Sequence, residues 1–454
     1  MHRQAHELDL THGITGLLVA LYGTAALVNA VAAYRFWSRR EHRAGEWPRA
    51  QALTWVMVGL FFSVLVPLAA RGDADTLRWI TFPASFRNLV DRLMGPLVVM
   101  LGSMIALGIL YRFRAFFTRP PVAWAAFNLS LLCLGFSLPD PDFAALVLKP
   151  DNVPIVGLIY LLAFFTWLAA RQAVLNDTRR ARGQEPREAE GRERVLVWPD
   201  LVYIELISMV GLTALLIAWS LLVQAPLEAE ASTVATPNPS KAPWYFLGLQ
   251  EMLLYFDPWM AGVVLPSLII FGLCAIPYID TNRKGNGYYT IEERRFAYLT
   301  FQFGFLVLWI LPMLIGTFFR GPNWSFFGFF ETWDVHKVAA LNNVPLSKWF
   351  WIDWLNRPMP EAPEQAGALT QLVYALWREI PGFVLLSGYF LGVPLLLARS
   401  SNKLRNVRRQ MGLARYLVVV VLLLLMILLP IKMVCRWAFN VNYFVSIPEY
   451  SFNF

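Results

Sequence analysis

The stretch Tyr416–Val434 reads YLVVVVLLLLMILLPIKMV, and Lys432 is its only charged residue. A helix that crosses a membrane needs about 20 mostly apolar residues, so this stretch is long enough. It is too long and too evenly apolar for a strand, and only a helix satisfies all its backbone hydrogen bonds within one lipid-embedded segment. The stretch therefore predicts a transmembrane helix.

Nine further stretches of the chain share these properties. They lie at 13–34, 51–70, 93–111, 122–138, 153–170, 201–223, 259–279, 297–319 and 380–398. The composition agrees, because 57% of the 454 residues are hydrophobic and 15% are charged, whereas soluble domains carry about 25% charged residues. The predicted fold class is all-α: a polytopic membrane protein with about ten transmembrane helices.

The basic residues are distributed unevenly among the loops. Most of the 39 Lys and Arg side chains lie in alternate loops, at 35–50, 112–121, 171–200, 280–296 and 399–415. Basic loops mark the cytoplasmic side and contact anionic lipid. This pattern predicts a multi-pass protein of a bacterial inner (plasma) membrane with both termini periplasmic. It also argues against nucleic acid as the reason for the net charge of +8.

Two hydrophilic segments divide the chain. Residues 171–197 read as a basic cytoplasmic linker that follows a five-helix membrane region, 1–170. Residues 321–379 form an aromatic-rich periplasmic segment, with Trp and Phe placed either at the membrane interface or on a docking face for a partner. Two transmembrane helices within 380–454 end the chain.

Redox ligands are scarce in this sequence. The five histidines all lie outside the apolar stretches, so the chain offers no paired imidazoles for a b-type haem in the membrane. The three cysteines form no paired motif, and we expect neither an iron–sulfur site nor another metal site. Glu205 is the only acid inside a span, which disfavours a proton-coupled transporter.

The most informative loop is Thr236–Glu251, which reads TPNPSKAPWYFLGLQE. Its three prolines, at 237, 239 and 243, favour an extended and rigid backbone. An aromatic amphipathic segment begins at Trp244. We expect that segment to lie along the membrane interface.

The order of features from 198 to 320 resembles the C-terminal domain of cytochrome b, the part that stands alone as subunit IV in some cytochrome bc complexes. The resemblance rests on Trp198–Tyr203 at the start of one helix, the connection 225–256, Leu265–Pro266 and Ala275–Asp280 in the next helix, and the span 297–319. The regions 1–170 and 380–454 show no such resemblance.

The resemblance implies a function. It identifies the chain as a haem-free membrane subunit of a quinol-oxidising cytochrome bc-type complex, one part of an oxidoreductase rather than an enzyme alone. Ubiquinol or menaquinol would bind at the periplasmic side. The implied partners are a haem-b subunit similar to the N-terminal part of cytochrome b, a Rieske or other iron–sulfur protein, and a c-type cytochrome.

The resemblance also points to site residues. Ala242-Pro243-Trp244-Tyr245 stands where the family has Pro-Glu-Trp-Tyr, so Pro243, Trp244 and Tyr245 are the expected quinol-binding residues, and Tyr245 is also a catalytic candidate. The family's glutamate, the proton acceptor, is missing. Glu251 is the candidate replacement because it follows Trp244 by seven residues, or two helical turns; Asp257 is second. Two alternatives remain open: a structural anchor of a respiratory complex without an active quinol site, and a transporter.

Overall fold

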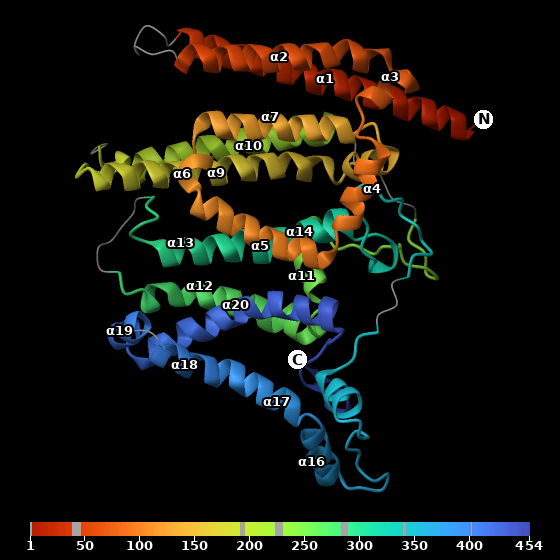
Figure 1. Cartoon of the computed structure of the whole chain (residues 1–454), viewed down its shortest axis with the longest axis vertical. Helices are drawn as coiled ribbons and strands as arrows, with labels where there is room; N and C mark the ends of the chain where they lie inside the picture. The colour runs from red at the N-terminus through yellow and green to blue at the C-terminus, as the bar shows by residue number, and fades with distance from the viewer. Residues whose placement is uncertain are drawn as a thin grey trace. The chain divides into compact units, whose positions relative to one another are not determined.

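The computed structural model describes residues 2–38, 47–190, 196–222, 230–282, 289–338, 342–400 and 402–454. The described chain is almost entirely helical, with one small two-stranded sheet (Figure 1). The predicted all-α class is confirmed.

Nine helical stretches in the described residues are long and apolar enough to cross a membrane. They are Gly13–Ser38, Gln51–Arg71, Pro120–Ser137, Val153–Ala181, Val197–Leu222, Met260–Ile279, Arg295–Phe319, Ile380–Arg399 and Leu413–Phe439. The chain is a multi-pass membrane protein by this criterion.

The span expected at 93–111 is not a single straight helix. Helices α4 (Ala84–Leu93) and α5 (Pro96–Arg112) meet at an angle of 86°. Pro96 has no backbone N–H to continue the helix from α4, but it fits well at the first position of α5. Counting this bent pair as one span gives the ten that the sequence predicts.

By its contacts, the chain forms two compact units. The first unit comprises residues 1–88, 110–236 and 287–295, and the second comprises 89–109, 237–286 and 296–454. The domain boundaries that we expect from the sequence, at 170, 197, 320 and 379, follow changes in composition and stay predictions.

In the first unit, α1 (His2–Ser38) and α2 (Trp47–Arg71) lie side by side, and α7 (Pro120–Ser137) packs on α1 (Figure 1). Gly135 of α7 faces Tyr22 of α1 so closely that an added Cβ would lie 2.6 Å from the tyrosine ring. Only glycine therefore allows this approach.

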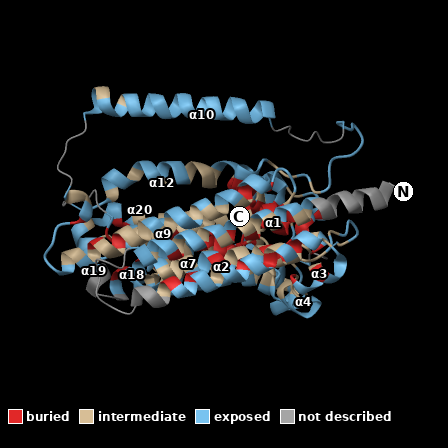
Figure 2. Cartoon of the chain, turned by 90° about the horizontal axis from the view of Figure 1, so that it is seen from above, coloured by how far each residue is buried: buried red, intermediate tan, exposed pale blue. Residues whose placement is uncertain are grey.

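The remaining elements of the first unit are shorter or lie at its surface. They are α3 (Ala74–Trp79), α6 (Arg114–Phe117), α8 (Pro141–Val147), α9 (Val153–Ala181), the turn Arg187–Ala189 and α10 (Val202–Leu222). Every residue of α10 from Tyr203 to Leu222 is exposed within the chain, Glu205 included (Figure 2). Such an apolar helix needs lipid or another protein around it.

The end of α9 holds a loop that comes from much later in the chain. Asp177 accepts hydrogen bonds from the backbone N–H groups of Ile291 and Glu292, and the fully buried Asn176 donates to the carbonyl of Tyr289. Arg114 forms an ion pair with Glu292. Residues 289–294, the described end of the loop before the span Arg295–Phe319, are thus part of the first unit.

The second unit holds the family-like segment and the C-terminal helices. Its α-helices are α11 (Leu247–Met252), α12 (Leu265–Ile279), α13 (Arg295–Gln302), α14 (Leu311–Leu314), α15 (Leu346–Lys348), α16 (Ala368–Arg378), α17 (Ile380–Ser387), α18 (Val393–Ser400), α19 (Asn402–Met411) and α20 (Leu413–Phe439). Wider π-helical turns at 260–264, 303–310, 315–319, 349–354 and 388–392 join or extend several of them. Short 3₁₀ turns lie at 244–246, 322–324 and 448–450.

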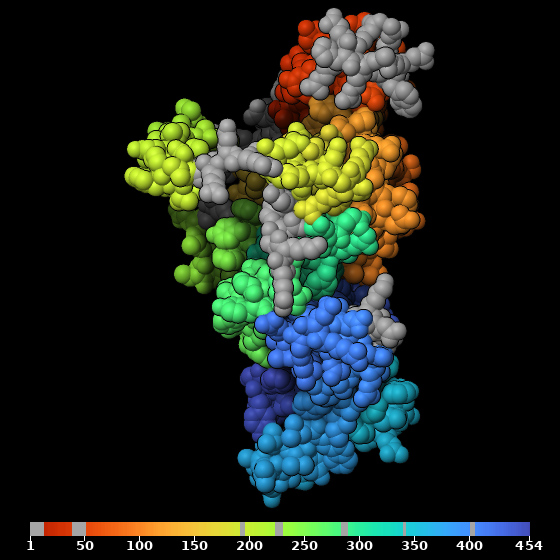
Figure 3. Space-filling view, turned by 90° about the vertical axis from the view of Figure 1, so that its left-hand side faces the viewer, coloured from red at the N-terminus to blue at the C-terminus, as the bar shows by residue number. Residues whose placement is uncertain are grey.

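The C-terminal tail folds back on the second unit. Strands β1 (Ser446–Ile447) and β2 (Phe452–Asn453) pair antiparallel, with Ser446 opposite Asn453. The connector between α18 and α20 lies at the surface (Figure 3).

Candidate functional site

The proline-rich loop before Trp244 is fastened at both of its ends. The amide of Gln250 accepts from the N–H of Ala242 at 2.8 Å and donates to the carbonyl of Ser240 at 2.8 Å. Asn238 exchanges two hydrogen bonds with Asn323, at 2.7 and 2.9 Å. These bonds close the loop on itself and attach it to the turn after the span Arg295–Phe319.

That turn has an unusual backbone. Asn323 and Trp324 have φ angles of 57° and 55°, in the left-handed region that side chains other than glycine seldom adopt. Such residues persist where the surroundings fix them. Here Asn238 binds Asn323, and Arg320 donates to the carbonyl of Trp324 at 3.0 Å.

Lys241 adds a further attachment. Its Nζ donates to the carbonyl of Thr317 at 2.8 Å and lies 4.8 Å from the centre of the Trp333 ring. A cation over an aromatic face is attracted by the negative charge of that face. The loop thus contacts both the end of the span and the aromatic segment that follows it.

Three aromatic residues follow Pro243 and form what we call the aromatic ledge, Trp244–Phe246. They make one 3₁₀ turn, with neighbouring ring centres 5.8 and 4.6 Å apart. Trp244 is 43% and Tyr245 48% exposed. The ledge therefore presents ring faces and edges to its surroundings from a rigid backbone.

Helix α11 carries the ledge and packs tightly on the span behind it. An added Cβ on Gly248 would lie 3.2 Å from Met313, and one on Gly316 would lie 3.0 Å from Leu247. Both contacts are closer than nearly all real Cβ contacts. The two glycines let α11 and the end of the span Arg295–Phe319 approach closely. This contact fixes the position of the ledge along that span.

Glu251, the predicted proton acceptor, points inward from α11. Its two carboxylate oxygens accept from Nε and Nη2 of Arg320, at 2.9 and 2.6 Å. Both side chains are 1% exposed. A two-point guanidinium–carboxylate pair of this kind is strong and fixed in orientation. Although burial lowers the pKa of Arg320, attraction and hydrogen bonding by Glu251 raise it more, so the guanidinium stays charged.

Tyr255 completes the carboxylate's environment. Its hydroxyl donates to Glu251 at 3.0 Å and accepts from the indole N–H of Trp437 at 3.1 Å. Burial raises the pKa of Tyr255 above its ordinary value, and the negative charge of Glu251 adds to that rise. Tyr255 therefore remains a neutral phenol and a hydrogen-bond donor.

The last span, α20, supplies the other cations of this cluster. Arg436 donates to the carbonyl of Leu254. Lys432, 1% exposed, donates to the carbonyl of Asn442 at 2.6 Å, and its ammonium lies 4.8 to 5.3 Å from the ring centres of three aromatic residues. The rings are those of Phe256, Tyr443 and Phe444.

The structure separates the predicted site residues into two groups. Pro243, Trp244 and Tyr245 lie together at the exposed ledge, whereas Glu251 lies in the interior with Arg320. Asp257, the second candidate base, accepts from the side-chain amide of Asn453 at 2.8 Å. The assignment of either acid as the proton acceptor stays a prediction.

Three residues of this cluster are not predicted from the sequence: Arg320, Tyr255 and Trp437. Arg320 carried one signal, because it is the first charged residue after 24 uncharged ones that begin at Phe296. A lone arginine at the end of an apolar span often has a buried partner. Nothing in the sequence connected it with a glutamate 69 positions earlier.

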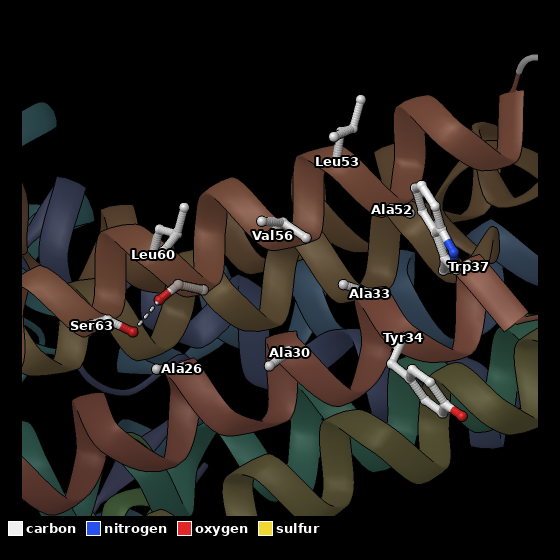
Figure 4. A pocket seen from close by; sticks show the side chains of 11 residues that line it. Ala26, Ala30, Ala33, Tyr34, Trp37, Ala52, Leu53, Val56, Leu60 and Ser63 are labelled. Atoms are coloured by element: carbon white, nitrogen blue, oxygen red, sulfur yellow. Dashed lines mark hydrogen bonds between the residues drawn. The ribbon is translucent and has the colours of Figure 1, made fainter.

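Two pockets of the described structure lie in the first unit. One is an open groove of about 340 Å³ between α1 and α2, lined mainly by small and aliphatic side chains such as Ala26, Ala30 and Val56 (Figure 4). The other, about 280 Å³, is lined by α2 and α7. Across the described ranges, no group of three or more His, Cys, Asp or Glu side chains could hold a metal ion.

Comparison with known proteins identifies one segment. Residues 230–320 match the family model described as "Cytochrome b(C-terminal)/b6/petD". This range contains the proline-rich loop, the ledge, Glu251 and Arg320, and it ends at the predicted boundary of 320, whereas the predicted first helix of the unit lies before it. No solved structure matches the chain. The resemblance read from the sequence is confirmed, and the segment is of the kind found in membrane electron-transfer subunits.

Proposed function

We propose that this chain is a haem-free subunit of a quinol-oxidising cytochrome bc-type complex and forms part of its periplasmic quinol site. The observation that carries the proposal is the ledge: exposed rings on a doubly fastened loop, inside the segment that matches the family. Planar quinols bind well against aromatic side chains with a few placed polar groups. Pro243, Trp244 and Tyr245 form one wall of the site.

The remaining walls and all the redox centres belong to partners in this proposal. A haem-b subunit, a Rieske or other iron–sulfur protein and a c-type cytochrome take the two electrons of ubiquinol or menaquinol. The exposed helix α10 agrees with this arrangement, because it is mostly apolar beyond Glu205 in its first turn and has no buried residue within the chain. It fits an obligate interface with another membrane subunit or with lipid.

Glu251 is the proposed proton acceptor in this site, and its burial sets a condition. A general base must come within about 3 Å of the hydroxyl that it deprotonates. Arg320 and Tyr255 already donate hydrogen bonds to the Glu251 carboxylate. Glu251 must therefore exchange one of these hydrogen bonds for one from the quinol hydroxyl before it takes the proton.

A structural anchor is the second candidate function, and the same contacts favour it. A carboxylate with a two-point arginine and a tyrosine hydroxyl already has the partners that a buried charge needs. In this alternative Glu251 only fixes α11, and the ledge contacts lipid or a partner protein.

Turnover of the purified complex separates the two functions. Tyr245→Ala should lower quinol oxidation at least tenfold while haem content and co-purifying subunits stay unchanged, because it removes a ring from the wall. Glu251→Gln should lower turnover by about 10²-fold or more if the residue is the base. Tyr450→Ala is the matched control, since Tyr450 is 52% exposed in the C-terminal tail. Full turnover of both site variants in an intact complex would establish the anchor.

A further inference from the structure

The connector between the last two spans is strongly basic. Residues 399–415 hold six basic side chains and no acid. Most of them lie on α19, ten residues of which four are basic, directly between α18 and α20. Gly412, with a φ of 79°, makes the sharp turn from α19 into α20, a conformation that favours glycine.

Three arginines of α6 and α9 have acidic partners within the chain. Arg114 forms an ion pair with Glu292, Arg179 with Glu190 and Arg180 with Glu293. Two of these pairs hold the loop at residues 289–294, and the third joins the end of α9 to Glu190. Their charge is therefore already compensated.

The α19 arginines differ in this respect. Arg405, Arg408 and Arg409 of α19, and Arg415 in the first turn of α20, are all exposed, and within the described part of the chain none of them forms an ion pair. Arg405 donates to the carbonyl of Arg399 at 3.0 Å. Because a carbonyl is neutral, this bond does not compensate the charge of Arg405. This patch of positive charge therefore favours binding of an anionic partner.

The position of α19 selects the partner. The ends of the two spans beside it are packed together, because buried Tyr416 of α20 donates to the carbonyl of Pro394 in α18 at 3.1 Å. α19 leaves one span at Ser400 and reaches the next at Leu413, so it stays at the boundary of the lipid. Phospholipid headgroups are its unavoidable neighbours, whereas a soluble protein is not.

We infer that α19 and Arg415 form a binding surface for anionic phospholipid headgroups. The guanidinium groups bind phosphate oxygens in two-point contacts. Each basic residue near an anionic surface strengthens attraction about fivefold. This inference is independent of the quinol proposal.

Native mass spectrometry of the full chain in detergent tests it, with phosphatidylglycerol and phosphatidylcholine as the two probes. We expect phosphatidylglycerol to bind roughly ten- to a hundredfold more tightly. The triple variant Arg405→Gln, Arg408→Gln, Arg409→Gln should lose most of that preference, and the matching Arg→Lys triple should keep most of it. Raising the salt concentration should weaken the preference.

A second triple controls for net charge. Arg78→Gln, Lys149→Gln and Arg357→Gln remove the same charge from other exposed positions and should leave the preference intact. The inference is overturned if the wild-type chain shows no preference, which would assign the patch to an acidic protein instead. Equal loss in both Gln triples would also overturn it, because the effect would then follow net charge alone.

Discussion

Two ion pairs of the second unit fasten segments that lie outside the spans, and they do so in opposite environments. Glu251 and Arg320 are both 1% exposed and hold the ledge helix to the end of a span. Arg378 and Glu449, 13% and 50% exposed, hold the C-terminal tail to α16. Each pair has two-point geometry, with distances between 2.6 and 3.0 Å.

The difference between them lies in what remains when one partner is lost. Water can replace Arg378 beside the half-exposed Glu449, and Arg378 keeps Glu379 as a second carboxylate partner, so this pair should contribute about 0 to 1 kcal/mol. Removing one partner of a buried pair leaves a charge without water or counter-charge, which costs about 3 to 5 kcal/mol. Loss of one partner should therefore destabilise the attachment of the ledge strongly and the attachment of the tail only slightly.

The largest effect should come from breaking the buried pair. We expect Arg320→Gln to lower the free energy of unfolding of the purified chain by about 3 to 5 kcal/mol, because Glu251 loses its counter-charge. Unfolding in detergent, followed by tryptophan fluorescence, measures it. The double variant Glu251→Leu, Arg320→Leu should recover much of this loss. A loss below about 1 kcal/mol in Arg320→Gln would show that water reaches the pair.

An intermediate effect should come from the place where the tail crosses α17. A Cβ added to Gly382 would clash with the carbonyl oxygen of Phe444, so Gly382→Ala must displace the tail. We expect a loss of about 1 to 3 kcal/mol, as for other overpacked contacts. Gly388→Ala is the matched control, because nothing lies within 4 Å of its added Cβ. Equal stability of the two variants would contradict the docked tail.

The smallest effect should come from the exposed pair and should depend on pH. Hydrogen bonds from Arg378 hold the pKa of Glu449 below its ordinary value of 4.5. The stabilisation is therefore complete above pH 4.5 and is lost as the pH falls through the lowered pKa. Glu449→Gln should cost less than about 1 kcal/mol at pH 7.

A series of thermal scans from pH 7 to pH 3 checks this prediction. The difference between the wild-type chain and Glu449→Gln should shrink as the pH falls. A difference that stays constant over this range would exclude titration of Glu449 as its cause.

Local properties of the sequence predicted most of the fold. Each span is a continuous apolar run, so its length and position follow from composition alone. The bend before Pro96 was missed because α4 is too polar to appear as part of a span. The proline-rich loop and the ledge were also readable, since proline placement and aromatic clustering are local signals.

The interior of the site could not be read in this way. Helical spacing predicts Glu251 on the same face as Trp244, but Trp244 lies in a 3₁₀ turn before α11 and is exposed, whereas Glu251 is buried. The spacing also could not show which neighbour the carboxylate contacts. Arg320 lies 69 residues after Glu251, and Trp437 lies 182 after Tyr255. Contacts over such separations depend on how the spans pack. The lone charge of Lys432 in the apolar stretch of α20 is a sequence signal, but it does not identify the partners of Lys432.

Cross-linking with a photoreactive azidoquinone in the purified complex tests the central claim most directly. We predict that illumination labels the peptide containing Trp244 and Tyr245, that excess unlabelled quinol prevents the labelling, and that Tyr245→Ala lowers it at unchanged subunit content. Labelling confined to other subunits or to other parts of this chain, with the 243–251 peptide unmodified, would contradict the assignment of the ledge as a wall of the quinol site.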